Sequence, residues 1–141
     1  MSELDRFIRA QEYNYSDALK EIKNGQKISH WMWYVFPQIK GLGKSDTAKW
    51  YAIKNLQEAK DYLNNEILSN RLEQICKALL DLDCNDAYKI FGSPDDMKLK
   101  SSMTLFEIAA PDNKIFKRVL DKYFNGERDQ KTIEIISSMQ K

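Results

Sequence analysis

The sequence predicts an all-α protein, a single compact domain over residues 1–141 with about eight or nine helices joined by short loops. Three observations favour this fold class. Apolar residues recur three and four positions apart in segment after segment, which is the spacing of one helix face. Asparagine, glycine and proline separate those segments. One run alone would suit a β-strand, and a lone strand without a partner is unstable.

Two helices are expected in the N-terminal segment. Apolar residues at helical spacing over 4–8 predict the first, with Ser2 as its N-cap. The second is expected to begin at Ser16 and to end at Asn24–Gly25, because glycine readily adopts the left-handed conformation that terminates a helix.

The segment 29–38 (SHWMWYVFPQ) is the most unusual in the chain. Its aromatic residues and its valine would suit a strand as well as a helix, and periodicity does not separate the two. Ser29 as an N-cap and Pro37 as a terminator favour a short helix. Four of its aromatic residues fall within six positions, more than one helix face can bury, so another element must cover the remainder.

The middle of the chain is expected to be helical as well. Residues 41–43 form a glycine-containing loop, and Ser45 caps the helix that follows it. Asn55 opens the next helix, which Asn64–Asn65 interrupts. A long helix then places leucine and isoleucine in a four-three alternation over 68–82, a stripe that predicts the central core helix.

Capping signals divide the C-terminal third of the chain. Ser93 as an N-cap, with Pro94 at the first helical position, predicts a helix that Pro111 ends. Asp112 caps the next helix, and a final helix begins at Asp129. No composition shift marks a boundary, so these segments complete one domain.

Composition and charge exclude several classes of protein. Hydrophobic residues make up 43% and charged residues 30%, with Gly 5 and Pro 3, which excludes a disordered or repeat-linker chain. Lys and Arg number 22 against 21 Asp and Glu, so the net charge of +1 provides no global field toward nucleic acid or an anionic membrane. Because basic and acidic residues are interspersed, nucleic acid ranks last among the candidate partners.

Cysteine usage and hydropathy indicate an intracellular protein without a metal. Cys76 and Cys84 are separated by seven residues and His30 is the sole histidine, so the usual zinc spacing cannot be assembled. Both cysteines are expected to be reduced thiols. No apolar stretch approaches the ~20 residues that cross a bilayer, and residues 1–9 are charged throughout, unlike a signal peptide. We therefore expect a cytoplasmic location, no membrane contact and no cofactor.

Gly43-Lys44-Ser45 resembles the end of a phosphate-binding loop, in which backbone N–H groups and a lysine hold phosphate. The full pattern fails, because Gln38 stands where the first glycine is required and no strand precedes it. What remains is a flexible loop that carries Lys44 into a helix N-terminus at Ser45, a candidate anion site. An ordinary capped loop is the alternative.

His30 is the residue that titrates near neutral pH, so an acid–base reaction led by an imidazole must use it. A hydrogen-bonded structural histidine is the alternative. Trp33 or Tyr34 could line a pocket in which a flat ligand stacks, or both could belong to the core. Nothing ties His30 to a cysteine or an acid, so whether the protein is an enzyme stays open.

A polar stripe lies on the helix expected after residue 94. Lys98 and Ser102 are four positions apart, as are Lys100 and Thr104, with Ser101 between them. A solvated face is the default interpretation. A lysine beside two hydroxyl groups can also hold a phosphate or a carboxylate.

Three runs carry a family resemblance: 29–38 (SHWMWYVFPQ), 41–45 (GLGKS), and 91–106 (FGSPDDMKLKSSMTLF). In order and spacing, from about Leu4 to Phe124, the chain resembles the domain-of-unknown-function 1810 family. The resemblance implies a helical single-domain protein and no established activity. Some members bear the label calpastatin, which implies a disordered inhibitor that this composition does not support. The runs coincide with the chemically unusual segments, which implies either a shared site or a shared core.

Two hypotheses for function follow. The first is a site that binds, or turns over, a small phosphorylated or anionic ligand such as a nucleotide, with His30 as the candidate proton carrier. Its candidate ligand-binding residues are Trp33, Gln38, Lys44, Ser45, Lys98, Ser101 and Ser102. The second is a helical interaction module without catalytic activity, in which the surplus aromatics and Met32 form a groove for a partner protein's helix. The first predicts a polar pocket, and the second an exposed apolar patch.

Overall fold

Helices form the regular structure of the protein, as the sequence predicts. A computed structural model describes residues 3–140, and over that range the chain contains nine helices and no β-strand. They are α1 (Asp5–Lys23), α2 (Met32–Val35), α3 (Asp46–Trp50), α4 (Leu56–Asn64), α5 (Glu66–Asp81), α6 (Ala87–Phe91), α7 (Asp95–Ala109), α8 (Ile115–Phe124) and α9 (Gln130–Met139). Ile39 and Ile53 form an isolated parallel bridge. No helix within residues 3–140 has the length and apolar character needed to cross a membrane.

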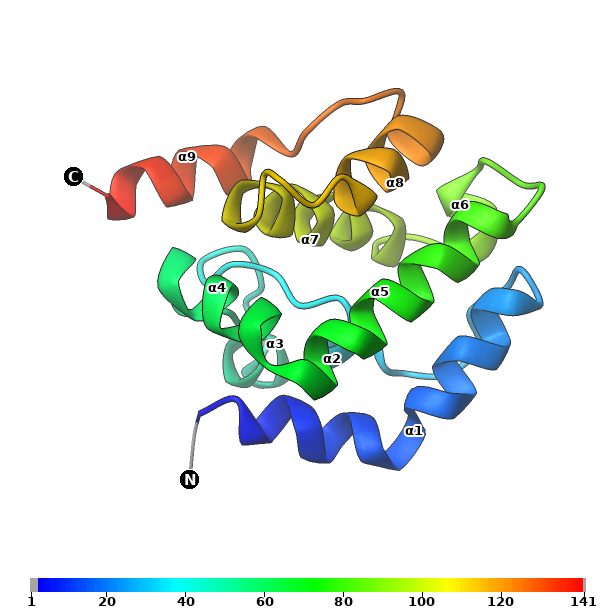
Figure 1. Ribbon diagram of the computed structural model, residues 1–141, viewed down its shortest axis with the longest axis horizontal. Coiled ribbons are helices and arrows are strands. Elements are labelled where there is room, and N and C mark those ends of the chain that lie inside the picture. Colours follow the sequence, from blue (N-terminus) through cyan, green and yellow to red (C-terminus); the bar gives the residue numbers. More distant parts are fainter. Residues whose placement is uncertain (1–2, 141) are drawn as a thin grey trace.

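The centre of the fold is α7, which packs against α4, α6, α8 and α9 (Figure 1). Its residues 101–106 are all buried, so it is covered on every side and lacks the single stripe of an amphipathic helix. The predicted stripe belongs to α5, which packs against α1, α4 and α8. The prediction that this helix is the central one is wrong, because a stripe marks a helix that keeps one face in solvent.

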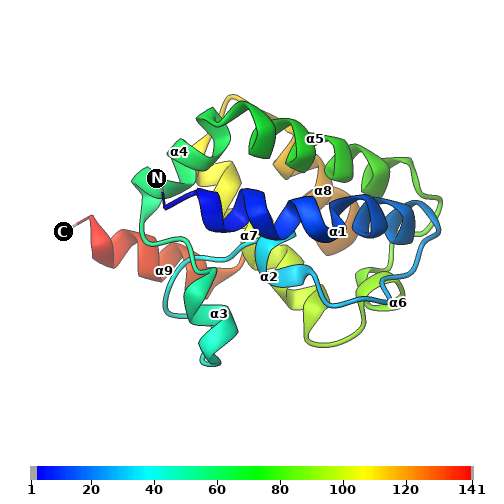
Figure 2. The ribbon, with the colours of Figure 1, turned by 90° about the horizontal axis from the view of Figure 1, so that it is seen from below.

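The two helices predicted in the N-terminal segment are the two halves of a single element, α1, which is kinked between them. Asn14 has non-helical dihedral angles, φ −147° and ψ 20°, and divides α1 into two halves. The helix ends at Asn24 and Gly25 as predicted, with Gly25 at φ +79°. Ser2, the predicted N-cap, lies outside the described residues. The first half of α1 lies beside the segment that contains α3 (Figure 2).

The aromatic run 29–38 contains a single helical turn, α2. Trp31 occupies its N-cap position without a side-chain cap, and the Ser29 hydroxyl instead donates to the Glu21 carboxylate at 2.6 Å. The predicted Ser29 cap is therefore wrong. Trp31 and Phe36 are buried in the core, whereas Trp33 is partly exposed, so this run contributes both to the core and to the surface.

Three of the predicted helix starts are capped as expected. Ser45, Asn55 and Asp129 each accept a hydrogen bond from a backbone N–H in the first turn of α3, α4 and α9, respectively. Ser93 and Asp112 do not cap, because each lies one or two residues ahead of the observed N-cap position of α7 or α8. Patterns in a sequence locate helix ends only to within one or two residues.

Candidate functional site

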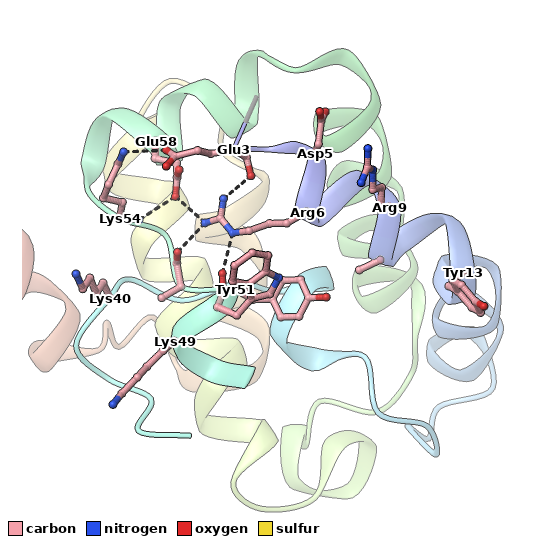
Figure 3. Close-up of a pocket in the computed structure, with 13 residues that line it drawn as sticks. Glu3, Asp5, Arg6, Arg9, Tyr13, Lys40, Lys49, Tyr51, Lys54 and Glu58 are labelled. Atoms are coloured by element: carbon pink, nitrogen blue, oxygen red, sulfur yellow. Dashed lines mark hydrogen bonds and ion pairs between the residues drawn. The ribbon is translucent and has the colours of Figure 1, made fainter. Parts of the chain in front are cut away.

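A cleft of about 760 Å³ opens between the first half of α1 and the segment that runs from α3 into α4 (Figure 3). Residues within 3–13 form one wall and residues within 49–58 form the other, with Lys40 beside them. Tyr13 is the last residue of α1 that lines the cleft, and the kink at Asn14 follows it directly. The fold thus brings together segments that are far apart in the sequence.

Arg6 joins the two walls. Its Nε donates to the Trp50 carbonyl at 2.8 Å, and its Nη2 donates to the Ala52 carbonyl at 2.9 Å. The same Nη2 lies 3.0 Å from the carboxylate of Glu58, which also accepts from the backbone N–H of Lys54 at 2.9 Å. Because these donors are committed to the protein, Arg6 supports the cleft instead of standing free for a ligand.

The cleft carries an excess of positive charge. Five cations line it against three carboxylates, Arg6, Arg9, Lys40, Lys49 and Lys54 against Glu3, Asp5 and Glu58, which leaves a net charge of +2. Glu3 pairs with Lys54 at 2.8 Å. Lys40 and Lys49 are exposed and form no ion pair within residues 3–140. Their side chains therefore favour an anion at this surface.

Aromatic side chains stand on both walls of the cleft. Tyr13 on α1 is 92% exposed and Trp50 on α3 is 64% exposed, so each presents a ring to solvent. Tyr51 lies deeper, with its ring centroid 5.1 Å from that of Tyr34 and 6.0 Å from that of Phe7. Exposed rings beside exposed lysines can hold a flat ligand that carries negative charge.

Three of the residues predicted from the sequence meet at a second, smaller cavity. Trp33, Gln38 and Lys98 line it, and its volume of about 10 Å³ has room for roughly one water molecule. The Lys98 ammonium lies 5.5 Å from the centroid of the Trp33 ring and 3.6 Å from the Asp95 carboxylate. Tyr51 lines this cavity as well as the cleft, so the two share a wall.

The loop with the partial phosphate-binding pattern borders the small cavity through Gly43. A Cβ atom on Gly43 would lie 2.4 Å from the Cβ of Ala48, so close packing against α3 requires glycine here. The Ser45 hydroxyl caps α3 by accepting from the Ala48 N–H at 3.1 Å. Lys44 and His30 are exposed, and neither lines either cavity.

Ser101 and Ser102 lie inside the protein. The Ser101 hydroxyl lies 3.1 Å from the carboxylate of Asp129, the residue that caps α9. Ser102 is fully buried, and its hydroxyl has no hydrogen-bond partner among the described residues. Neither serine lines either cavity, so the structure does not gather the predicted set into one pocket.

Sequence reasoning did not find the cleft, because its residues come from separate segments and form no motif. One signal was available. Trp50 is the last residue of α3 and Tyr51 is its C-cap residue, and a five-residue helix has too little surface to bury both neighbouring rings. At least one of them therefore had to face solvent beside the exposed Lys49.

Comparisons with known proteins agree with the fold. A family model described as "Protein of unknown function (DUF1810)" matches residues 1–136. The crystal structure of the conserved hypothetical protein Rv1873 from Mycobacterium tuberculosis matches with a TM-score of 0.94 and 41% sequence identity over 96% of each chain. No curated protein matches. The resemblance predicted from the three sequence runs is confirmed, and the chain belongs to the DUF1810 family.

Proposed function

We propose that the protein binds a small phosphorylated ligand with a planar group, such as a nucleotide, in the cleft between α1 and α3. The observation that carries this proposal is that two lysines without an ion pair among the described residues, Lys40 and Lys49, lie beside the exposed Trp50 in one cleft. The ammonium groups pair with phosphate, and the indole stacks on the planar group. The volume of about 760 Å³ lies within the usual range for small-molecule sites.

The cleft suits a nucleotide better than the cavity that contains Trp33, Gln38 and Lys98. That cavity holds about one water molecule, which is far smaller than a nucleotide. We therefore keep the ligand class that the sequence predicts and propose a different site for it. A direct contact between a ligand and the family-signature residues stays a prediction, which a Lys98→Gln variant tests beside the cleft variants.

We propose binding and assign no reaction, because two of the carboxylates that line the cleft already form ion pairs. Glu3 and Glu58 are committed to ion pairs with Lys54 and Arg6, respectively. The alternative function, docking of a partner protein's helix, calls for an apolar groove, and a cleft with a net charge of +2 suits an anion better. The cytoplasmic location that the sequence predicts would place the cleft among phosphorylated metabolites.

Isothermal titration calorimetry with nucleoside monophosphates, nucleoside diphosphates and inorganic phosphate tests the proposal. We expect Trp50→Ala to weaken nucleotide binding about tenfold, because stacking on an aromatic ring contributes about 1–3 kcal/mol per base. Lys49→Gln should weaken binding by a few-fold and reduce its dependence on salt concentration, since exposed charges are screened by salt. Inorganic phosphate should respond to Lys49→Gln and not to Trp50→Ala.

Two matched variants control for unspecific effects. Tyr88→Ala removes a ring that is 62% exposed on α6, outside the cleft, and Lys131→Gln removes an exposed lysine of α9. Both should bind as the wild type does. Absence of binding by every probe, or equal effects of Trp50→Ala and Tyr88→Ala, would contradict the proposal. If Lys98→Gln is the one variant that loses binding, the ligand binds at the family-signature residues instead of in the cleft.

A further inference from the structure

We infer that Tyr34, in the family-signature run 29–38, is a positioning residue that sets the separation between the two walls of the cleft. Tyr34 does not line the cleft, yet it contacts both of its walls. The part of the inference that concerns affinity rests on the proposed function. The part that concerns the separation of the walls does not depend on any ligand.

The first wall is the half of α1 that precedes the kink. All the α1 residues that line the cleft lie between Asp5 and Tyr13. The Tyr34 hydroxyl donates to the side-chain oxygen of Asn14, the kink residue, at 2.9 Å. The Tyr34 carbonyl accepts from the buried side-chain amide of Gln11 at 2.7 Å. One residue therefore holds α1 both at the kink and one turn before it.

The second wall is the segment that leaves α3. The Tyr34 ring packs against Tyr51, with 5.1 Å between their centroids. The backbone beyond α2 holds the same segment, because the Ile53 N–H donates to the Gln38 carbonyl and the Lys40 N–H donates to the Ile53 carbonyl, both at 2.8 Å. The wall that carries Trp50 and Tyr51 is thereby tied to the signature run.

Through these contacts Tyr34 does more than fill space in the core. A kink is a point at which the two halves of a helix can change their relative direction, so a bond at the kink fixes the direction of the half that forms the cleft wall. A tyrosine hydroxyl is protonated near neutral pH, and burial raises the pKa of Tyr34 above the ordinary value of 10.0, so the group remains a donor. Binding sites need such supporting contacts to hold their geometry.

Tyr34→Phe tests the inference, because it removes the hydroxyl and keeps the ring. Tyr15→Phe is the matched control: the Tyr15 hydroxyl donates to the Arg71 carbonyl at 2.6 Å, from the other half of α1 toward α5. Spin labels at positions 12 and 47, both exposed and on the two sides of the cleft, report the separation of the walls. A Cys84→Ser background prevents labelling of the one partly exposed native cysteine.

We expect Tyr34→Phe to shift or broaden the distance distribution between the labels and to weaken nucleotide binding by about three- to tenfold, the size expected for one lost hydrogen bond. Tyr15→Phe should leave both the distance and the affinity as in the wild type. Identical distances and affinities for the two variants would overturn the inference. If Tyr34→Phe does not fold, Asn14→Ala removes the acceptor of the same bond and provides the same two measurements.

The outcomes also separate this inference from the proposed function. If the wild type binds none of the probes, the proposed function fails, and the spin-label distances still decide the role of Tyr34. If the wild type binds and Trp50→Ala weakens binding while Tyr34→Phe behaves as Tyr15→Phe does, the proposed function stands and the inference fails.

Discussion

At the scale of single residues, Glu21 shows how the chain holds its most unusual segment. Its carboxylate accepts from the backbone N–H groups of Ile28 and Ser29 at 2.7 and 2.9 Å, from the Ser29 hydroxyl at 2.6 Å, and from the Trp31 indole at 2.9 Å. Burial by itself raises the pKa of this carboxyl, but the hydrogen bonds from Ser29, Ile28 and Trp31 together outweigh burial and lower the pKa to about 2. Glu21 thus anchors the start of the run that continues to Tyr34.

Glu21→Gln should lower the free energy of unfolding by about 2–3 kcal/mol at pH 7, because hydrogen bonds to a charged acceptor are the stronger ones. The carboxyl has a lower pKa in the folded state than its usual value of 4.5, so its contribution is complete above that value and is lost as the pH falls toward 2. Urea unfolding of the wild type and the variant at pH 7 and pH 3 measures this contribution to the free energy of unfolding. The difference between wild type and variant should shrink at pH 3.

Glu12→Gln is the control for this prediction, because Glu12 is an exposed residue of the same helix. It should change the free energy of unfolding by less than about 0.5 kcal/mol at either pH. A Glu21→Gln variant that unfolds at the same urea concentration as Glu12→Gln would show that the four hydrogen bonds contribute no net stability.

At the scale of elements, side-chain caps explain where several helices begin. Asn65 serves two helices, since its backbone N–H donates to the Asp61 carbonyl at the end of α4 and its side chain accepts from the Leu68 N–H at the start of α5. Such caps depend on a few neighbouring residues, which is why the sequence predicts those at Ser45 and Asp129. The sequence predicts a break near Ser16 but not the contact that holds the kink, because Tyr34, which bonds the kink residue Asn14, lies 20 positions away.

Asn65→Ala should destabilise the protein by about 1 kcal/mol, the usual cost of losing an N-cap. Asn70→Ala is the control, because Asn70 is exposed in the second turn of α5, beyond the cap, where alanine has the higher helix propensity. Thermal unfolding followed by circular dichroism measures both variants. A melting temperature for Asn65→Ala at or above that of Asn70→Ala would contradict the capping role.

At the scale of the whole molecule, the fold follows from local signals and the cleft does not. Helical spacing and capping residues predict the all-α class, because each depends on residues within one or two turns. The central position of α7 was missed because burial on all sides removes the stripe that marks a helix face. The cleft was missed because it forms only when α1 packs beside α3, through contacts such as that of Arg6 with the Trp50 carbonyl.

The predicted ligand site shows the same difference between what local sequence patterns predict and what the packing of distant segments decides. Trp33, Gln38 and Lys98 do come together, as the family-signature runs suggested. Their cavity is small because the signature run packs against its neighbours, and the role we propose for that run is to support the cleft through Tyr34. A signature in a sequence indicates that residues act together, and the structure is needed to tell a supporting contact from a contact with ligand.

Amide chemical-shift mapping by NMR tests the central claim most directly. Uniformly labelled protein is titrated with the nucleoside monophosphate that binds most tightly in calorimetry, and the shift of each backbone amide is followed. The account predicts that the largest changes fall within residues 3–13, at Lys40 and within 49–58, the residues that form the cleft. Largest changes around Trp33 and Lys98, or no changes at millimolar nucleotide, would contradict it.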